Sequence, residues 1–377
     1  MLLLASLALA AWLYLACFHG RFWFSGPELP ATPATVAKNV AVIVPARNEE
    51  DSIERALRSL LVQNFAGEIS VILIDDNSTD RTSAIAASLA AEHSNLIVLN
   101  EAQLPAGWSG KLWAVHQGLS HPLAQTADYV LLTDADIEHT PDHIARLVAK
   151  SESEGLELVS EMVHLHCSTF PERALIPAFI FFFQMLYPFR RAASSRSSIA
   201  AAAGGTILVA RAALDRIDGV QRIRRQLIDD CALAREVKHS GGRIWLGSSR
   251  STVSLRVYAH SSEIWNMIAR TAFVQLHHSL LSLAGCILGM SLLYLVPPAL
   301  ALFAFGSACA IPRFAALAAW LLMSALFQPT LRSYRSSPLW GFALPLIALF
   351  YLCATIASAY RHYAGRGGNW KARTYPA

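Results

Sequence analysis

The chain has 377 residues, of which 54% are hydrophobic and 15% charged, a mixture that excludes both an ordinary water-soluble protein and a protein lying wholly within a membrane. The formal net charge is only +4, and the Lys and Arg residues form no long run, which argues against nucleic acid as a partner. The six cysteines are widely spaced without a CxxC pair, so neither a disulfide framework nor a structural zinc site is expected.

The chain opens with an apolar stretch, residues 1–18, followed by bulky aromatic residues. A secretory signal peptide would carry a basic start and a small-residue cleavage site, and the sequence has neither, so we expect an uncleaved membrane anchor within residues 1–24. Basic residues follow this stretch, and the positive-inside rule therefore places the next domain in the cytosol. Three prolines make residues 25–38 a linker.

From Asn39 to about His164 the sequence alternates short apolar strands with helical stretches. This rhythm is typical of an α/β domain with a parallel, doubly wound sheet. Such sheets bind ligands beyond the carboxyl ends of their strands, so the residues that follow each strand are the first candidates for a site. The strand candidates are residues 40–45, 69–75, 96–99, 129–132 and 156–160.

Polar residues follow the first two predicted strands. The first strand runs into the sequence PARNEE, and the second ends in DDNSTD. A strand-end acid can accept hydrogen bonds from a base or a ribose, whereas the Ser, Thr and Asp after it favour a cap for the next helix. The candidate residues are Pro45, Ala46, Arg47 and Glu49 after the first strand, and Asp75 and Asp76 at the end of the second.

Two carboxylates, Asp134 and Asp136, come directly after the apolar run at 129–132. Residues two apart in an extended backbone point the same way, so both acids can face one point beyond the strand. Their mutual repulsion favours a hard divalent cation, shared with a diphosphate, between them. The alternative is that both acids cap a helix beginning near Thr140 and Pro141.

In this order, the sequences PARNEE, DDNSTD and DAD resemble glycosyltransferase family 2, over residues 39 to about 246. The resemblance implies the A-type fold and a glycosyltransferase domain at 39–272. It also implies that the first two loops and Asp134 bind a nucleotide-diphosphate sugar of the UDP-sugar type, and that Asp136, assisted by Asp134, holds Mg²⁺ or Mn²⁺. Neither GxGxxG nor GxxxxGK[ST] occurs, which disfavours dinucleotide and phosphate-loop sites.

Two glycine-containing segments extend the resemblance. In GWSGKLWAVHQG, residues 107–118, Lys111 takes the place of a lysine that meets the donor in the family. In AAAGGTILVAR, residues 201–211, Gly204 and Gly205 would line the acceptor site, and we expect a strand here. A tight turn is the alternative explanation of the two glycines.

Asp229 and Asp230 open a predicted helix that ends near Gly241, and a strand, RIWL, follows it. The resemblance aligns the pair with a Glu-Asp motif, in which Asp229 replaces the Glu and Asp230 is the catalytic base of an inverting transfer. The alternative is that both acids only complement the positive amino end of the helix.

Some processive and lipid-directed members carry QxxRW after this point, where the present chain has EIWNMIARTAF, residues 263–273. Arg270 matches the arginine of that motif, but Thr271 replaces the tryptophan. The departure argues against a polymerising synthase and leaves Arg270 as a candidate contact for the diphosphate or the acceptor.

Residues 174–189 are rich in aromatic side chains and contain Pro177 and Pro188. The segment is too short for a comfortable membrane span, so we expect an interfacial helix with its aromatic face in lipid and Arg190 and Arg191 at the headgroups.

From residue 279 the chain is apolar almost to its end. Residues 279–311 exceed the length of one span and contain Pro297 and Pro298, which suggests two short spans, and two more follow before residue 360. With four spans in 273–360, the basic tail at 361–377 is cytosolic, as the positive-inside rule favours. The spans therefore predict a multi-pass membrane protein, and the resemblance to bacterial lipid-directed glycosyltransferases implies the inner membrane.

A domain for a charged donor joined to so much membrane-spanning chain indicates a lipid acceptor. Among lipid-directed members, the order of the segments is most similar to the hopene-associated glycosyltransferases, which implies a hopanoid or related isoprenoid acceptor. A polyprenyl-phosphate glycosyltransferase would keep the same donor site. A membrane scaffold or transporter with a degenerate sugar-nucleotide domain is disfavoured, because the spans hold almost no ionisable residues.

Overall fold

The computed structural model describes residues 1–30, 37–304, 306, 310–365, 369–370 and 373–374. Parts of the predicted linker at 25–38 and of the predicted tail at 361–377 lie outside these ranges. The chain forms two compact units, which we describe separately. Unit 1 comprises Met1–Ser25, Cys167–Pro188 and Val257–Ala377, and unit 2 comprises Gly26–His166 and Phe189–Arg256.

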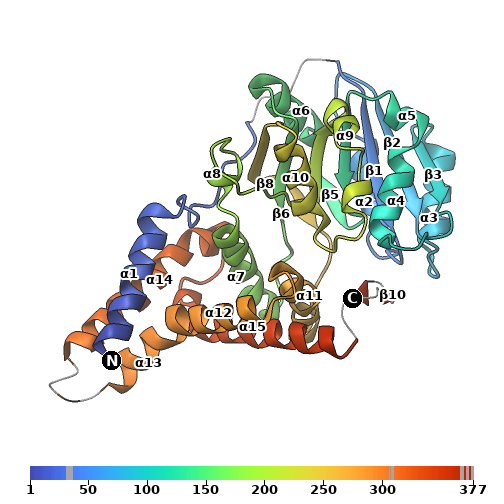
Figure 1. Ribbon diagram of the computed structural model, residues 1–377. Coiled ribbons are helices and arrows are strands. Elements are labelled where there is room, and N and C mark those ends of the chain that lie inside the picture. The colour runs from blue at the N-terminus through green and yellow to red at the C-terminus, as the bar shows by residue number, and fades with distance from the viewer. Residues whose placement is uncertain (31–36, 305, 307–309, 366–368, 371–372, 375–377) are drawn as a thin grey trace. The chain divides into compact units, whose positions relative to one another are not determined.

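Unit 2 is built on one eight-stranded sheet, with the strand order β3-β2-β1-β4-β7-β6-β8-β5 (Figure 1). The first four strands in sequence pair in parallel, as predicted. β7 runs antiparallel to both of its neighbours, and β5 runs antiparallel to β8, so the sheet is mixed rather than wholly parallel. The strands are β1 (Val40–Ala46), β2 (Ile69–Asp75), β3 (Leu96–Asn100), β4 (Tyr129–Thr133), β5 (Ile137–His139), β6 (Leu158–His164), β7 (Thr206–Ala210) and β8 (Ile244–Ser254).

Helices cover both faces of this sheet, because its central strands are apolar on both sides. Ile43 of β1 belongs to one buried cluster, and its neighbours Val42 and Val44 belong to the other, as the two-residue period of a strand requires. The helices of unit 2 are α2 (Ile53–Leu61), α3 (Thr82–Glu92), α4 (Gly110–Leu119), α5 (Pro122–Gln125), α6 (His143–Glu154), α8 (Phe189–Ala192), α9 (Arg211–Arg216) and α10 (Asp229–His239), with a 3-10 turn at Gln221–Ile223.

The segment after the paired acids is not arranged as the alternative explanation requires, in which both acids cap the next helix. β5 lies between Asp136 and α6, and Asp142 is the residue before the first turn of α6. Asp134 and Asp136 therefore do not cap that helix. The predicted strand at 201–211 begins only at Thr206, because Gly204 and Gly205 form a turn in which the Thr206 amide bonds to the Ala203 carbonyl.

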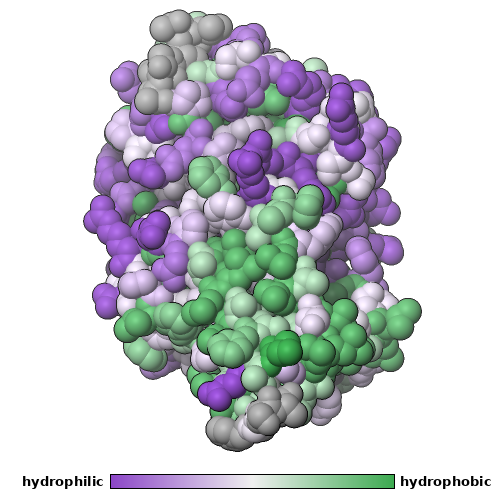
Figure 2. Space-filling model, turned by 90° about the vertical axis from the view of Figure 1, so that its left-hand side faces the viewer, coloured by the Kyte–Doolittle hydropathy of each residue, from purple (hydrophilic) through white to green (hydrophobic). Residues whose placement is uncertain are grey.

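Unit 1 is helical and apolar, and Figure 2 shows apolar residues gathered over a large part of one face of the molecule. Three of its helical stretches are long and apolar enough to cross a membrane: Leu280–Phe303, Ala310–Ser333 and Trp340–Tyr363. The elements are α1 (Leu2–Phe18), α7 (Phe170–Leu186), α11 (Ser261–Gln275), α12 (Leu280–Met290), a π-helical segment (Ser291–Leu295), α13 (Val296–Phe303), α14 (Ala310–Ser333), α15 (Trp340–Tyr363) and the short pair β9 (Asn369–Trp370) and β10 (Arg373–Thr374).

The expected break at Pro297 and Pro298 does not occur. These prolines lie in the first turn of α13, directly after the π-helical segment, and the helical stretch continues through them. Proline is tolerated in a first turn, and the wider π turn accommodates the missing amide bonds. One long stretch therefore replaces the two predicted short spans.

The predicted interfacial helix is present as α7, but its aromatic face is packed against protein. The Phe181 ring lies 5.1 Å from that of Phe327 on α14, and the Phe182 ring lies 4.9 Å from that of Tyr351 on α15. Residues 167–188 and 257–272 of the predicted glycosyltransferase domain belong to unit 1 rather than to unit 2. Phe181 and Phe182 therefore face other helices rather than lipid, and the interfacial placement of α7 stays a prediction.

Candidate active site

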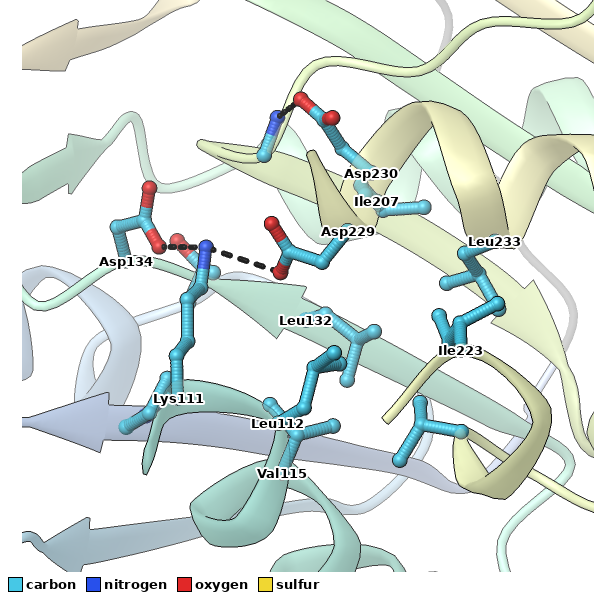
Figure 3. Close-up of a pocket in the computed structure, with 14 residues that line it drawn as sticks. Lys111, Leu112, Val115, Leu132, Asp134, Ile207, Ile223, Asp229, Asp230 and Leu233 are labelled. Atoms are coloured by element: carbon cyan, nitrogen blue, oxygen red, sulfur yellow. Dashed lines mark hydrogen bonds and ion pairs between the residues drawn. The ribbon is translucent and has the colours of Figure 1, made fainter. Parts of the chain in front are cut away.

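The sheet topology brings several segments to one edge of unit 2. β1 and β4 are parallel, so their carboxyl ends lie together, and Thr133 pairs with Thr206 of the reversed strand β7. The Gly204-Gly205 turn before β7 is therefore at the same edge. A pocket of about 370 Å³, including space open to solvent, lies there (Figure 3). The predicted site residues in its wall are Pro45, Lys111, Asp134, Gly204, Asp229 and Asp230.

Lys111 lines this pocket, in the first turn of α4. Its Nζ is 2.9 Å from Asp134 Oδ1 and 3.3 Å from Asp229 Oδ2 (Figure 3). Burial alone would lower the pKa of Lys111, but the charges of the two acids outweigh it and raise the pKa above its ordinary value. Lys111 therefore stays charged and joins the acid after β4 to the acid that opens α10.

Asp230 is held separately from Lys111, by backbone donors. Its carboxylate accepts a hydrogen bond from the Gly204 amide at 3.0 Å and one from the Cys231 amide at 2.7 Å. Burial, followed by the charge of Asp229, raises the pKa of Asp230 to about 6, although the two amides oppose the shift. A carboxylate with a pKa near neutral pH is well matched to proton abstraction.

The two glycines have different structural roles. A Cβ on Gly205 would lie 2.6 Å from Val163 Cγ1, so packing excludes a side chain there. A Cβ on Gly204 would lie 3.5 Å from Lys111 Nζ and 3.6 Å from Asp230 Oδ2, and would occupy space between the charged groups. Gly204 therefore keeps the pocket open beside the acids.

The loops after β1 and β2 are bonded to each other. Arg47 Nη1 donates to the Asp76 carbonyl at 2.6 Å and to its carboxylate at 3.2 Å. Asp75 accepts hydrogen bonds from the amide and hydroxyl of Ser78, and Asp80 accepts one from the Thr82 amide at the start of α3. The turn chemistry predicted for the second loop is thus present, and Asp75 and Asp76 lie at the carboxyl edge as expected.

Asp136 lies beside a residue that the sequence analysis did not identify, Arg256. Arg256 Nε donates to Asp136 Oδ2 at 3.0 Å, and its Nη2 lies 3.3 Å from Glu49 Oε1. Burial, followed by the charge of Asp134, raises the pKa of Asp136, which indicates that the two carboxylates repel each other. Arg256 is 120 residues from Asp136, and no motif or spacing relates the two.

The acids offer an incomplete set of metal ligands. Among the described residues, no group of three His, Cys, Asp or Glu side chains could hold a metal ion. Asp134 and Asp136 supply hard carboxylate oxygens, and Mg²⁺ characteristically combines one or two carboxylates with water and substrate phosphates. The residues therefore fit a cation that binds together with a diphosphate.

Arg270 is exposed on α11 of unit 1. Its contact with the diphosphate or the acceptor remains a prediction.

The sheet and the helices on it define an A-type glycosyltransferase fold. The chain is similar to the solved structure of a mannosyltransferase from Pyrobaculum calidifontis in complex with GDP-Man and Mn²⁺, with a TM-score of 0.56 and 20% sequence identity over 95% of this chain and 97% of that one. At this identity, the likeness concerns the fold.

The sequence of the same unit is similar to one family in particular. Residues 41–218 match the model of Glycosyl transferase family 2. It is also 32% identical over 114 residues to a 4,4'-diaponeurosporenoate glycosyltransferase of Staphylococcus haemolyticus. That match covers 30% of this chain and 28% of the relative.

Proposed function

We propose that the protein is an inverting glycosyltransferase that moves a sugar from a nucleotide-diphosphate sugar to a lipid acceptor. The observation that carries this proposal is the pocket in which Asp134, Lys111, Asp229 and Asp230 meet at the carboxyl edge of the sheet. The family 2 domain and the nucleotide sugar named with the mannosyltransferase structure support a donor of this class.

In this proposal, the two halves of the reaction depend on different residues. Asp230 takes the proton of the acceptor hydroxyl as the new bond to the anomeric carbon forms. Asp134 and Asp136 would hold a divalent cation, Mg²⁺ or Mn²⁺, and that ion would stabilise the charge of the leaving diphosphate. Lys111 fixes the spacing of Asp134 from Asp229, next to the base. A base on the acceptor side and charge stabilisation on the donor side favour attack from the opposite face, and inversion follows.

The pocket also supports an apolar acceptor. Beyond the charged residues most of its wall is aliphatic, with Leu112, Val115, Leu132, Ile207, Val220, Ile223 and Leu233. The three long apolar helices of unit 1 and the lipid-like acceptor in the name of the Staphylococcus haemolyticus relative agree with this class. Within this class of apolar acceptors we propose a hopanoid or related isoprenoid. A polyprenyl phosphate is the second candidate.

Purified full-length protein in lipid nanodiscs should transfer sugar from a labelled UDP-sugar, in the presence of Mn²⁺, to a lipid extract that contains hydroxylated hopanoids. GDP-sugars and a polyprenyl phosphate provide the comparison arms, and mass spectrometry identifies the product. Transfer to polyprenyl phosphate alone would show that the acceptor is a polyprenyl phosphate rather than a hopanoid. A protein that neither transfers nor hydrolyses any donor would contradict the proposed activity and favour a scaffold.

We further propose that the protein lies in the bacterial inner membrane with unit 2 and the tail both in the cytosol. The charge rule favours a cytosolic tail. A cytosolic tail requires an even number of crossings after unit 2, so in this proposal one of the three long apolar stretches does not cross the membrane. In a variant without the six natural cysteines, Ala364→Cys should react with an impermeant thiol reagent only after the membrane is opened. Arg250→Cys, on the exposed surface of unit 2, is the matched control. Labelling of Ala364→Cys alone in intact cells would show that the tail is outside.

A further inference from the structure

A chain of buried polar side chains leads from the wall of the pocket into the interior of unit 2. Thr133, the residue before Asp134, lies 3.0 Å through its Oγ1 from His139 Nε2. His139 Nδ1 lies 2.9 Å from His143 Nδ1, and His143 Nε2 lies 3.1 Å from Glu161 Oε2. All four residues are at most 4% exposed. We call these four residues the buried polar chain.

The direction of each hydrogen bond follows from its end points. The Thr133 hydroxyl donates to the Gly205 carbonyl at 2.8 Å, because that carbonyl can only accept. The Thr133 oxygen therefore accepts from His139 Nε2, which leaves His139 Nδ1 as an acceptor for the proton on His143 Nδ1. A further proton must lie between His143 and Glu161, since two lone pairs would otherwise face each other. Burial, followed by the charge of His143, lowers the pKa of His139, which agrees with a neutral ring.

The buried polar chain closes the segment that carries the paired acids. Thr133 and His139 flank residues 134–138, so their hydrogen bond joins the two ends of that loop. His143 and Glu161 fix the His139 ring from behind, and the Ser249 hydroxyl donates to Glu161 Oε2 at 2.9 Å. A buried network of hydrogen bonds of this kind holds its members in one arrangement.

The buried polar chain also reaches the opposite side of the pocket. Thr133 bonds to the carbonyl of Gly205, and the amide of the adjacent Gly204 bonds to Asp230. One hydroxyl thus links the backbone before Asp134 to the turn that positions Asp230. The chemistry of the pocket uses Asp134 and Asp230 on different substrates, so their separation must be fixed to a fraction of an ångström.

We propose that Thr133, His139 and His143 are positioning residues that set the distance between the donor-side acids and Asp230. This inference rests on the proposed function. A positioning residue affects turnover and metal-dependent donor binding through the groups that it holds, whereas a residue that only supports the fold affects thermal stability.

Thr133→Val tests the proposal in full-length protein, since valine keeps the shape of threonine and removes the hydroxyl. We expect turnover, and the affinity for UDP or GDP in the presence of Mn²⁺, to fall by about 10-fold to 100-fold, as for other partners of metal-binding side chains. Thr133→Ser restores the hydroxyl and should restore both quantities. Thr206→Val is the matched control, because Thr206 faces Thr133 across the β4–β7 pair, is fully buried, and its hydroxyl has no hydrogen-bond partner among the described residues.

Normal turnover and nucleotide affinity in folded Thr133→Val would overturn the proposal, as would equal losses in Thr206→Val. If Thr133→Val does not fold, His139→Gln and His139→Leu replace it: glutamine retains a donor for Thr133 and should keep most of the turnover, and leucine should lose it. Equal activity of these two variants would also overturn the proposal. Absence of nucleotide binding and transfer in the wild-type protein would instead contradict the proposed function, and the inference with it.

Discussion

Asp230→Asn is expected to lower turnover by about 10²-fold to 10⁴-fold and to leave donor affinity nearly unchanged. Asparagine keeps the shape of the side chain and can still accept the hydrogen bond from the Gly204 amide, but it cannot take a proton. The alcohol of an acceptor is a poor nucleophile at neutral pH, so the loss of the base affects the chemical step. Single-turnover kinetics with labelled donor, beside equilibrium binding of the nucleotide, separates the two quantities.

Asp229→Asn is the matched comparison, because Asp229 is adjacent and carries the same charge but pairs with Lys111. Near-normal turnover of Asp230→Asn together with inactive Asp229→Asn would make Asp229 the base. The anomeric configuration of the product is an independent check, since retention of the donor configuration would be incompatible with one direct displacement.

The pH dependence follows from the raised pKa of Asp230, about 6. The base acts only when ionised, so turnover should fall as the pH decreases below about 6, and the residual turnover of Asp230→Asn should lack this dependence. The contribution of Asp230 to the stability of the fold changes with pH in the opposite direction to turnover. Since the pKa is higher in the folded protein than the ordinary 3.8, the contribution of this group to stability is complete below pH 3.8 and is lost as the pH rises through 6.

Long apolar runs allowed most strands of the sheet to be predicted. Where polar residues or glycines interrupt such a run, the predicted strand differs from the observed one. The expected strand at 69–75 coincides with β2. β8 was expected only at RIWL, since the Gly and Ser residues of its second half are typical of loops, yet that half pairs with β5. The three residues of β5 are too few to show a period. The antiparallel direction of β7 depends on the path of the connection before it, which no local pattern encodes.

The site was predictable where its residues follow strands or open helices. Asp134 was identified because it follows a strand, whereas Lys111 and Asp230 were identified from the resemblance to the family, and the structure brings all three to one pocket. Arg256 and the buried polar chain were not identified. A lone arginine after a strand and two histidines four residues apart are common in any α/β domain, and their partners are set by tertiary contacts, such as that of Arg256 with Glu49, 207 residues away.

Asp136→Ala is expected to abolish transfer and to weaken metal-dependent donor binding, while the protein stays folded. Asp136 accepts from Arg256 through Oδ2, and a carboxylate has further lone pairs with which it can also bind a cation. Arg256 would keep Glu49 as a partner after the substitution, so the fold should survive. Asp134 alone, already paired with Lys111, would then have to hold the ion with the diphosphate.

Titration of the nucleotide in Mn²⁺ and in excess chelator measures this effect without reference to turnover. Wild-type protein should bind UDP or GDP more tightly with the ion, and the difference should disappear in Asp136→Ala and in Asp136→Asn, which preserves the acceptor for Arg256. Asp142→Asn, at a partly exposed acid next to the start of α6, should behave as the wild type, because Asp142 does not line the pocket. Full activity in excess chelator would contradict the requirement for a divalent cation. Lys111 and Arg256 would then be the cations that balance the charges of Asp134 and Asp136.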